Sequence, residues 1–108
     1  MRVLLDESVP VQVCMAVHDY SVSTTVEMGW RGISNSELLD RAEAEGFGLV
    51  IVADKNLRHQ QNLTKRRIAI LELWTNHRPT LEQHFARIRD RVQSATNGQY
   101  IILEQVDK

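Results

Sequence analysis

The segment LVIVAD at residues 49–54 decides the fold. Five apolar residues stand in an unbroken row, and an acid follows them. A short continuous apolar run is typical of a strand covered on both faces, as in a parallel sheet between two layers of helices. The segment therefore predicts a central parallel strand over residues 49–53, with Asp54 directly after its carboxyl end.

On both sides of this run, short β-branched segments alternate with segments of helical pattern. Further strands are predicted at residues 3–5, 21–26, 67–73 and 100–103. Helices are predicted to begin at Ser8, Ser34 and Thr80, with a short helix over residues 56–63. Strands that alternate with helices form parallel sheets with right-handed crossovers. We expect an α/β fold, a three-layer α/β/α sandwich with a short, mainly parallel five-stranded sheet.

The composition is that of one globular domain. The chain has 108 residues, of which 43% are hydrophobic and 25% are charged, so we expect a single domain over residues 1–108. No run is long enough for a membrane span, and Asp6 and Glu7 interrupt the apolar start that a signal peptide would need. The lone Cys14 excludes an internal disulfide and a cysteine-based zinc site. These features predict a cytoplasmic protein with no membrane contact.

Charge is divided unevenly between the two halves of the chain. Residues 1–54 hold three basic and nine acidic side chains, whereas residues 55–108 hold ten and five, and the net charge is −1. The sum gives no overall electrostatic attraction to nucleic acid. The division is compatible with a basic wall beside an acidic pocket, and equally with a solvated helix face.

Acids follow three of the predicted strands: Asp6 and Glu7 the first, Glu27 the second, and Asp54 the third. Ligands of open parallel sheets bind beyond the carboxyl ends of the strands. If the first and third strands are neighbours, their ends lie about 4.8 Å apart. Two carboxylates at that spacing repel each other unless a cation separates them, and Mg²⁺ or Mn²⁺ suits such oxygen ligands. The pattern predicts metal-dependent phosphodiester cleavage.

Local structural roles compete with this interpretation. Asp54 could cap the helix that follows it, and Glu37 fills the last position of the capping box that begins at Ser34. Asp6 is harder to assign to a cap, because Ser8 already offers one to the next helix. Both roles can coexist at one residue.

Basic and aromatic residues near these acids are candidates for substrate binding. Lys55 and Arg58 follow Asp54 and could hold the phosphates of a nucleic acid strand. Trp30 lies in a glycine-flanked loop at the same edge and could stack on an unpaired base. Its alternative is to pack over the loop onto the next helix.

Three segments carry a resemblance to a known family. They are VLLDESVP at residues 3–10, EMGWRGISNSELLDRAEAEGF at 27–47 and VIVADKNLRHQQNL at 50–63. In order and spacing they resemble the small PIN-like domains of the DUF5615 type, which are related to the ribonuclease toxins of bacterial toxin–antitoxin pairs. The resemblance covers nearly the whole chain and is weakest after about residue 73.

The resemblance implies a metal-dependent nuclease. Asp6, Glu37 and Asp54 would be its catalytic, metal-binding acids, with Glu7 and Asn35 as supporting residues around them. It further implies Mg²⁺ or Mn²⁺ as cofactor, RNA as substrate, a small antitoxin protein as partner, and self-association as a homodimer. The chain departs from the family pattern at Asn35, where many relatives have an acid, and neither Glu72 nor Asp90 makes a convincing fourth acid.

Two other interpretations stay open. A response-regulator receiver domain also places two acids after its first strand and a phosphate-accepting Asp after its third, and Thr75 fits its switch hydroxyl. Its lysine would have to be Lys108 at the terminus, and no closing helix follows the last strand. A degenerate PIN-like domain would instead bind RNA or a protein without cleaving, as Asn35 and the missing fourth acid suggest.

Overall fold

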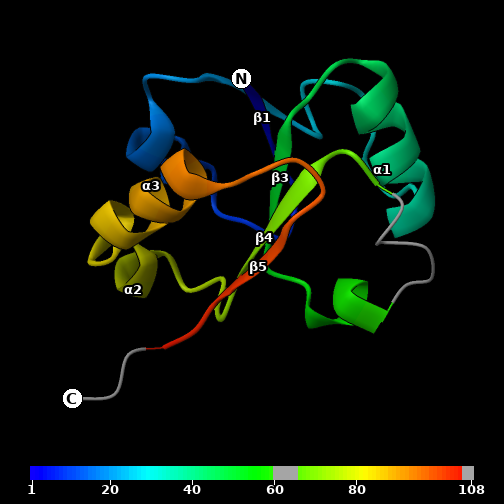
Figure 1. Ribbon diagram of the computed structural model, residues 1–108. Helices are drawn as coiled ribbons and strands as arrows, with labels where there is room; N and C mark the ends of the chain where they lie inside the picture. The colour runs from blue at the N-terminus through cyan, green and yellow to red at the C-terminus, as the bar shows by residue number, and fades with distance from the viewer. Residues whose placement is uncertain (60–65, 106–108) are drawn as a thin grey trace.

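The computed structural model describes residues 1–59 and 66–105, which form one parallel sheet between two layers of helices (Figure 1). The strands are β1 (Arg2–Leu5), β2 (Ser21–Thr24), β3 (Leu49–Val52), β4 (Ala69–Leu73) and β5 (Tyr100–Leu103). The α-helices are α1 (Asn35–Ala44), α2 (Arg78–Glu82) and α3 (Phe85–Ser94), and the 3₁₀ helices are η1 (Val11–Val17) and η2 (Lys55–His59). The predicted α/β class with a five-stranded parallel sheet is confirmed.

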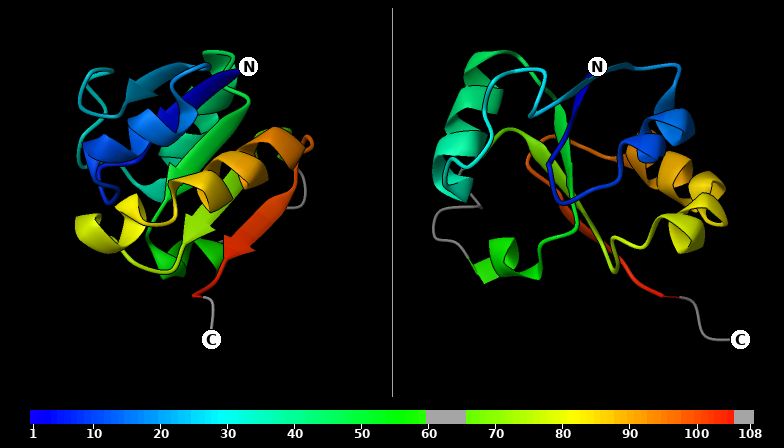
Figure 2. Two further views of the ribbon diagram at one scale, coloured as in Figure 1. Left: turned by 90° about the vertical axis from the view of Figure 1, so that its left-hand side faces the viewer. Right: turned by 180° about the vertical axis from the view of Figure 1, so that it is seen from behind.

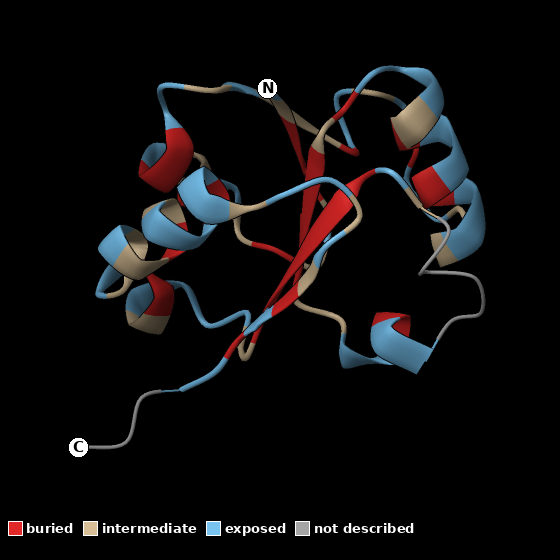
Figure 3. Ribbon diagram, viewed as in Figure 1, coloured by how far each residue is buried: buried red, intermediate tan, exposed pale blue. Residues whose placement is uncertain are grey.

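The sheet has the strand order β2-β1-β3-β4-β5, and every pairing is parallel. All four residues of β3 are buried, as expected for a strand with helices on both faces (Figure 3). Leu5 of β1 lies opposite Ile51 of β3. The carboxyl ends of these two strands therefore meet at the same edge of the sheet.

Each face of the sheet has its own apolar cluster. On one face, η1, α2 and α3 pack over the strands, and on the other lie α1 and η2 (Figures 1 and 2). The first cluster includes Leu5, Ile51 and Ile88, and the second includes Leu39 and Val50. Neighbouring strand residues thus point to opposite layers, which is the pleat expected of a central sheet.

The hand of one crossover differs from the prediction. The described part of the β3–β4 connection, η2, lies on the face of α1, since Leu57 belongs to the second cluster. The β4–β5 connection, α2 and α3, lies on the opposite face, with Leu81 and Ile88 in the first cluster. Both connections advance in the same direction across the sheet. The two crossovers therefore have opposite hands, and the expected uniform right-handedness is wrong for one of them.

The first predicted helix is shorter and of another type. It is the 3₁₀ helix η1, it begins after Pro10, and no side chain caps it. Ser8 was expected as its cap, but the Ser8 hydroxyl is used elsewhere: it donates to Asp6 and accepts from the backbone of Ala53. The second helix agrees with the prediction, because the Ser34 hydroxyl accepts from the Glu37 N–H.

The predicted last helix is divided in two. The helix α2 ends at Glu82, and α3 begins at Phe85. Thr80 does not cap a helix with its side chain, since its hydroxyl bonds to His77 Nδ1 at 2.8 Å. The His84 ring packs edge-on against Trp74, with ring centroids 5.0 Å apart, at the break between the two helices. This contact fixes the chain where a single helix was predicted.

Two other bounds differ by a few residues. The strand predicted at residues 21–26 ends at Thr24, and the one predicted at 67–73 begins at Ala69. The helix predicted at residues 56–63 is η2 as far as His59, and residues 60–63 lie outside the described part of the chain. Among the described helices, none is both long and apolar enough to cross a membrane.

Candidate functional site

The strand order reverses between β1 and β3. From β1 the chain continues to β2 on one side, and it later crosses to β3 on the other. The carboxyl ends at such a reversal leave a crevice in which open α/β sheets bind ligands. Asp6 directly follows β1, and Asp54 comes two residues after β3. Because the Asp6 N–H donates to the Ile51 carbonyl at 3.0 Å, the two segments stay paired up to the site.

Asp6 is oriented by Ser8. Its Oδ2 accepts from the Ser8 hydroxyl at 2.6 Å and from the Ser8 N–H at 3.1 Å. The same hydroxyl accepts from the Ala53 N–H at 3.0 Å, so it bridges the end of β1 and the residue before Asp54. The carboxylate is half-buried. These contacts hold Asp6 in one orientation and leave its Oδ1 with no hydrogen bond from residues 1–59 or 66–105.

Asp54 combines a local and a candidate functional role. Its Oδ1 accepts from the Asn56 N–H at 2.9 Å, which forms a turn at the start of η2. No described residue donates to its Oδ2. Asp6 and Asp54 line one pocket of about 400 Å³, whose other lining residues are Glu7, Ser8, Gly32, Ile33 and Asn35. Two carboxylates from neighbouring strands thus open onto the same space.

Glu7 and Asn35 border this pocket in different ways. The Glu7 Oε1 accepts from the Gly32 N–H at 3.1 Å and ties the glycine loop to the sheet edge. Gly32 has φ +77°, a conformation that side chains rarely adopt. Asn35, the first residue of α1, is half-buried and lines the pocket. Asn35 therefore borders the same space as the two aspartates.

Glu37 lies apart from these residues. It is in the first turn of α1, does not line the pocket, and its carboxylate pairs with Arg41 at 2.5 Å on an exposed surface. Glu27 is also used locally, since its Oε1 accepts from the Thr24 N–H at 2.9 Å. In the described part of the chain, no group of three or more Asp, Glu, His or Cys side chains is arranged to hold a metal ion.

The donor set nevertheless fits a divalent cation that keeps much of its water. Mg²⁺ and Mn²⁺ are commonly held by one or two carboxylates, with water completing the coordination. Asp6 and Asp54 each offer one oxygen that is free of hydrogen bonds from the described residues. The Asn35 amide adds a neutral donor at the same pocket.

The two residues predicted to bind phosphate differ, since Lys55 is exposed and Arg58 is held in an ion pair. Lys55 begins η2 and is exposed. Arg58 instead pairs with Glu72, which is fully buried on β4, and donates to it through two of its nitrogens. The Tyr100 hydroxyl also donates to Glu72, at 2.7 Å. The burial of Tyr100 and its bond to Glu72 raise the pKa of this phenol above its ordinary value. A substrate role for Arg58 is therefore not supported.

The base-stacking role predicted for Trp30 is not supported either. Its side chain is only 8% exposed and belongs to the second apolar cluster. It packs edge-on against Phe47, with ring centroids 6.2 Å apart. Trp30 therefore has the packing role that was the alternative to base stacking.

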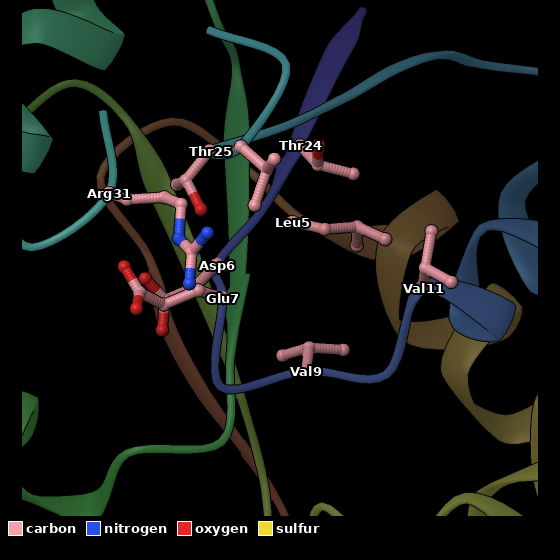
Figure 4. Close-up of a pocket in the computed structure, with 9 residues that line it drawn as sticks. Leu5, Asp6, Glu7, Val9, Val11, Thr24, Thr25 and Arg31 are labelled. Carbon is pink, nitrogen blue, oxygen red and sulfur yellow. The ribbon is translucent and has the colours of Figure 1, made fainter. Parts of the chain in front are cut away.

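Arg31, beside Trp30, was not singled out from the sequence. It is exposed and forms no ion pair within the described ranges 1–59 and 66–105. In Figure 4 its guanidinium extends toward Asp6 and Glu7. The glycines that flank it marked a loop, but a loop alone does not reveal which of its side chains faces the acids.

The features expected of a receiver domain are only partly present. The Thr75 hydroxyl, which would be the switch, accepts from the His77 N–H at 3.1 Å and does not line the pocket of Asp6 and Asp54. Lys108 lies outside the described residues.

Comparisons of the chain with family models, with curated proteins and with solved structures find no match.

Proposed function

We propose that this chain is a metal-dependent endoribonuclease of PIN type, the toxin of a toxin–antitoxin pair. The observation that supports it is the meeting of Asp6 and Asp54 in one pocket at the reversal of strand order. The second support is the resemblance of the three segments described above. The proposed substrate is RNA, and the proposed place of action is the cytoplasm.

Asp6, Asp54 and the Asn35 amide would hold Mg²⁺ or Mn²⁺. The ion supplies Lewis acidity for the hydrolysis of a phosphodiester. Ser8 keeps Asp6 oriented through two hydrogen bonds, and the turn to Asn56 does the same for Asp54. The two fixed carboxylates would define where the ion is held.

Positive charge near the acidic pocket would come from Arg31, whose guanidinium extends toward Asp6 and Glu7. The exposed Lys55, next to Asp54 in the chain, would add to it. Contacts of this type bind the phosphates of a strand without reading its sequence. In the reaction, water adds to phosphorus and one ester P–O bond breaks. One RNA fragment then ends in a phosphomonoester and the other in a hydroxyl group, with the proton of the water passing to the leaving oxygen.

The direct test of this function is cleavage of a single-stranded RNA by the purified protein in Mn²⁺ or Mg²⁺. Wild type should cleave, chelator should stop cleavage, and Asp6→Asn and Asp54→Asn should both be inactive. Glu27→Gln, which changes an acid outside the pocket, is the matched control and should remain active. Cleavage that survives in both aspartate variants would refute the proposal and indicate a contaminating nuclease.

The toxin role and the partners need a separate test. We propose a small antitoxin protein as partner and a homodimer as the assembly. Expression of the chain in bacteria should arrest growth, and Asp54→Asn should relieve the arrest. Growth arrest that persists in this variant would separate toxicity from the metal site.

A second candidate is a degenerate PIN-like module that binds RNA or a protein without cleaving. The observation that favours it is that, among the described residues, no group of three or more Asp, Glu, His or Cys side chains is arranged to hold a metal ion. In that case Asp54→Asn would leave affinity for the partner unchanged, and no sample would cleave RNA.

A further inference from the structure

A second cavity opens beside the acidic pocket. Its volume is about 450 Å³, and Asp6 and Glu7 line it as well as the first pocket. It lies between the ends of β1 and β2, the approach to η1 and the loop that carries Arg31. A molecule held by Asp6 in the first pocket could therefore extend directly into the second.

The walls of this cavity are of two kinds. Leu5, Val9, Val11 and Val26 form an apolar side, and the exposed fractions of Val11 and Val26 are both 55%. Figure 4 shows Arg31 on the side of Asp6 and Glu7, across from Leu5, Val9 and Val11. Ligand sites typically combine apolar walls with a few polar groups that fix orientation.

Thr25 contributes an unusual polar group to the wall. It is 1% exposed and lines the cavity. Its hydroxyl is the buried side-chain polar atom that lacks a hydrogen-bond partner within the described part of the chain. Buried polar groups are nearly always paired, so such an atom calls for an explanation. The oxygen has almost no accessible surface of its own, so a polar ligand edge in the cavity would become its partner through a rotation of the Thr25 side chain.

We propose that this cavity is a nucleobase subsite for the nucleotide next to the phosphate held at Asp6 and Asp54, an assignment that rests on the proposed ribonuclease function. The flat apolar faces of a base match the valine and leucine wall. The polar edge of the base finds the Thr25 hydroxyl and the Arg31 guanidinium. A ribose is polar on most sides and would leave the apolar wall without a partner.

The test is an NMR titration of ¹⁵N-labelled protein with adenosine, guanosine, cytidine and uridine, and with ribose alone as the comparison. At low-millimolar ligand, at least one nucleoside should shift the amide signals of residues 24–26 and of Val9, and ribose should not. Equal shifts with ribose, or no shifts at these residues with any nucleoside, would overturn the proposal. Uncharged nucleosides avoid the repulsion that Asp6 and Glu7 would exert on a phosphate.

Two variants define the site. Val26→Gln should weaken nucleoside binding about fivefold, because it removes part of the apolar area that the base would bury. Met15→Gln is the matched control: Met15 is 64% exposed and lines neither this cavity nor the acidic pocket, so its substitution should leave binding unchanged. Equal losses in both variants would contradict the assignment.

Thr25→Val tests the polar contact, because it removes the hydroxyl and keeps the shape of the side chain. The differences in affinity among the four nucleosides should shrink, while the melting temperature should not fall, since no hydrogen bond within the described chain is lost. Unchanged differences would remove Thr25 from the subsite.

These titrations need no catalysis, so they fail separately from the ribonuclease proposal. Nucleoside binding in a protein that does not cleave RNA would leave the subsite standing in a non-cleaving RNA binder. Metal-dependent cleavage with no nucleoside binding would refute the subsite alone.

Discussion

The Ser8 hydroxyl accepts a hydrogen bond from the Ala53 N–H at 3.0 Å, which joins the two strand ends that carry the acids. The same oxygen donates to Asp6 at 2.6 Å. One side chain therefore sets both the orientation of Asp6 and the position of the chain entering Asp54. When a carboxylate binds a metal ion, loss of a hydrogen bond that orients it commonly lowers the affinity for the metal about 10- to 100-fold.

Ser8→Ala should weaken Mn²⁺ binding about tenfold, because Asp6 loses its orienting hydroxyl. The free energy of unfolding should fall by about 1–2 kcal/mol, since the Ala53 N–H loses its acceptor. Isothermal titration and urea denaturation measure the two effects. Ser36→Ala, on the exposed side of α1, is the control and should change neither. An unaltered Mn²⁺ affinity in Ser8→Ala would mean that Asp6 does not need this contact.

Glu37→Gln should keep most of the Mn²⁺ affinity. The Glu37 carboxylate pairs with Arg41 and lies outside the pocket, so its charge acts on the ion only from a distance. The resemblance to PIN-like domains predicts the opposite, a loss as large as that of Asp54→Asn. Such a loss would mean that Glu37 leaves Arg41 and turns to the ion when it binds.

Arg58→Ala should lower the free energy of unfolding, because it leaves the buried Glu72 carboxylate without its cation. The decrease should be smaller than for a fully buried pair, because the Arg58 side chain is 37% exposed. Chemical denaturation measures the change. Arg58→Ala combined with Glu72→Gln should recover part of the loss, since no unpaired charge is then buried. A double variant less stable than the single one would contradict this explanation.

Tyr100 should make stability fall at alkaline pH. Its burial and its bond to Glu72 raise the pKa of the folded phenol above that of the unfolded chain, about 10. A raised pKa means that the stabilisation is complete below about pH 10 and is lost as the pH rises toward the folded pKa. Tyr100→Phe should therefore show a shallower alkaline decrease in the free energy of unfolding than wild type. An equally steep decrease in Tyr100→Phe and in wild type would contradict this explanation.

The pattern of residues 49–54 was enough to predict the central strand and the acid after it. A continuous apolar run needs cover on both faces, and β3 is buried throughout. The cap at Ser34 was also readable, since the bond from the Glu37 N–H depends only on residues three apart. The other half of the predicted capping box is not formed, because the Glu37 carboxylate pairs with Arg41. The meeting of Asp6 and Asp54 followed from the parallel sheet, because the carboxyl ends of its strands share one edge.

The contacts that were missed join residues far apart in the sequence. Glu72 is 14 positions from Arg58 and 28 positions from Tyr100 in the sequence. No local pattern therefore predicts that these residues pair. The position of Trp30 in a glycine-flanked loop leaves base stacking and loop packing both open, and only the structure shows that Phe47 provides a buried surface for it. Ser8 was read as a helix cap because caps are local, whereas its hydroxyl bonds across the sheet to Ala53.

The central claim is that Asp6 and Asp54 form one divalent cation site, and a Mn²⁺ titration followed by the electron paramagnetic resonance of the free ion tests it most directly. Wild type should bind one Mn²⁺, Asp6→Asn and Asp54→Asn should each lose most of the affinity, and the Glu27→Gln control should bind as wild type does. Loss in only one aspartate variant, or binding that is unchanged in both, would contradict the shared site.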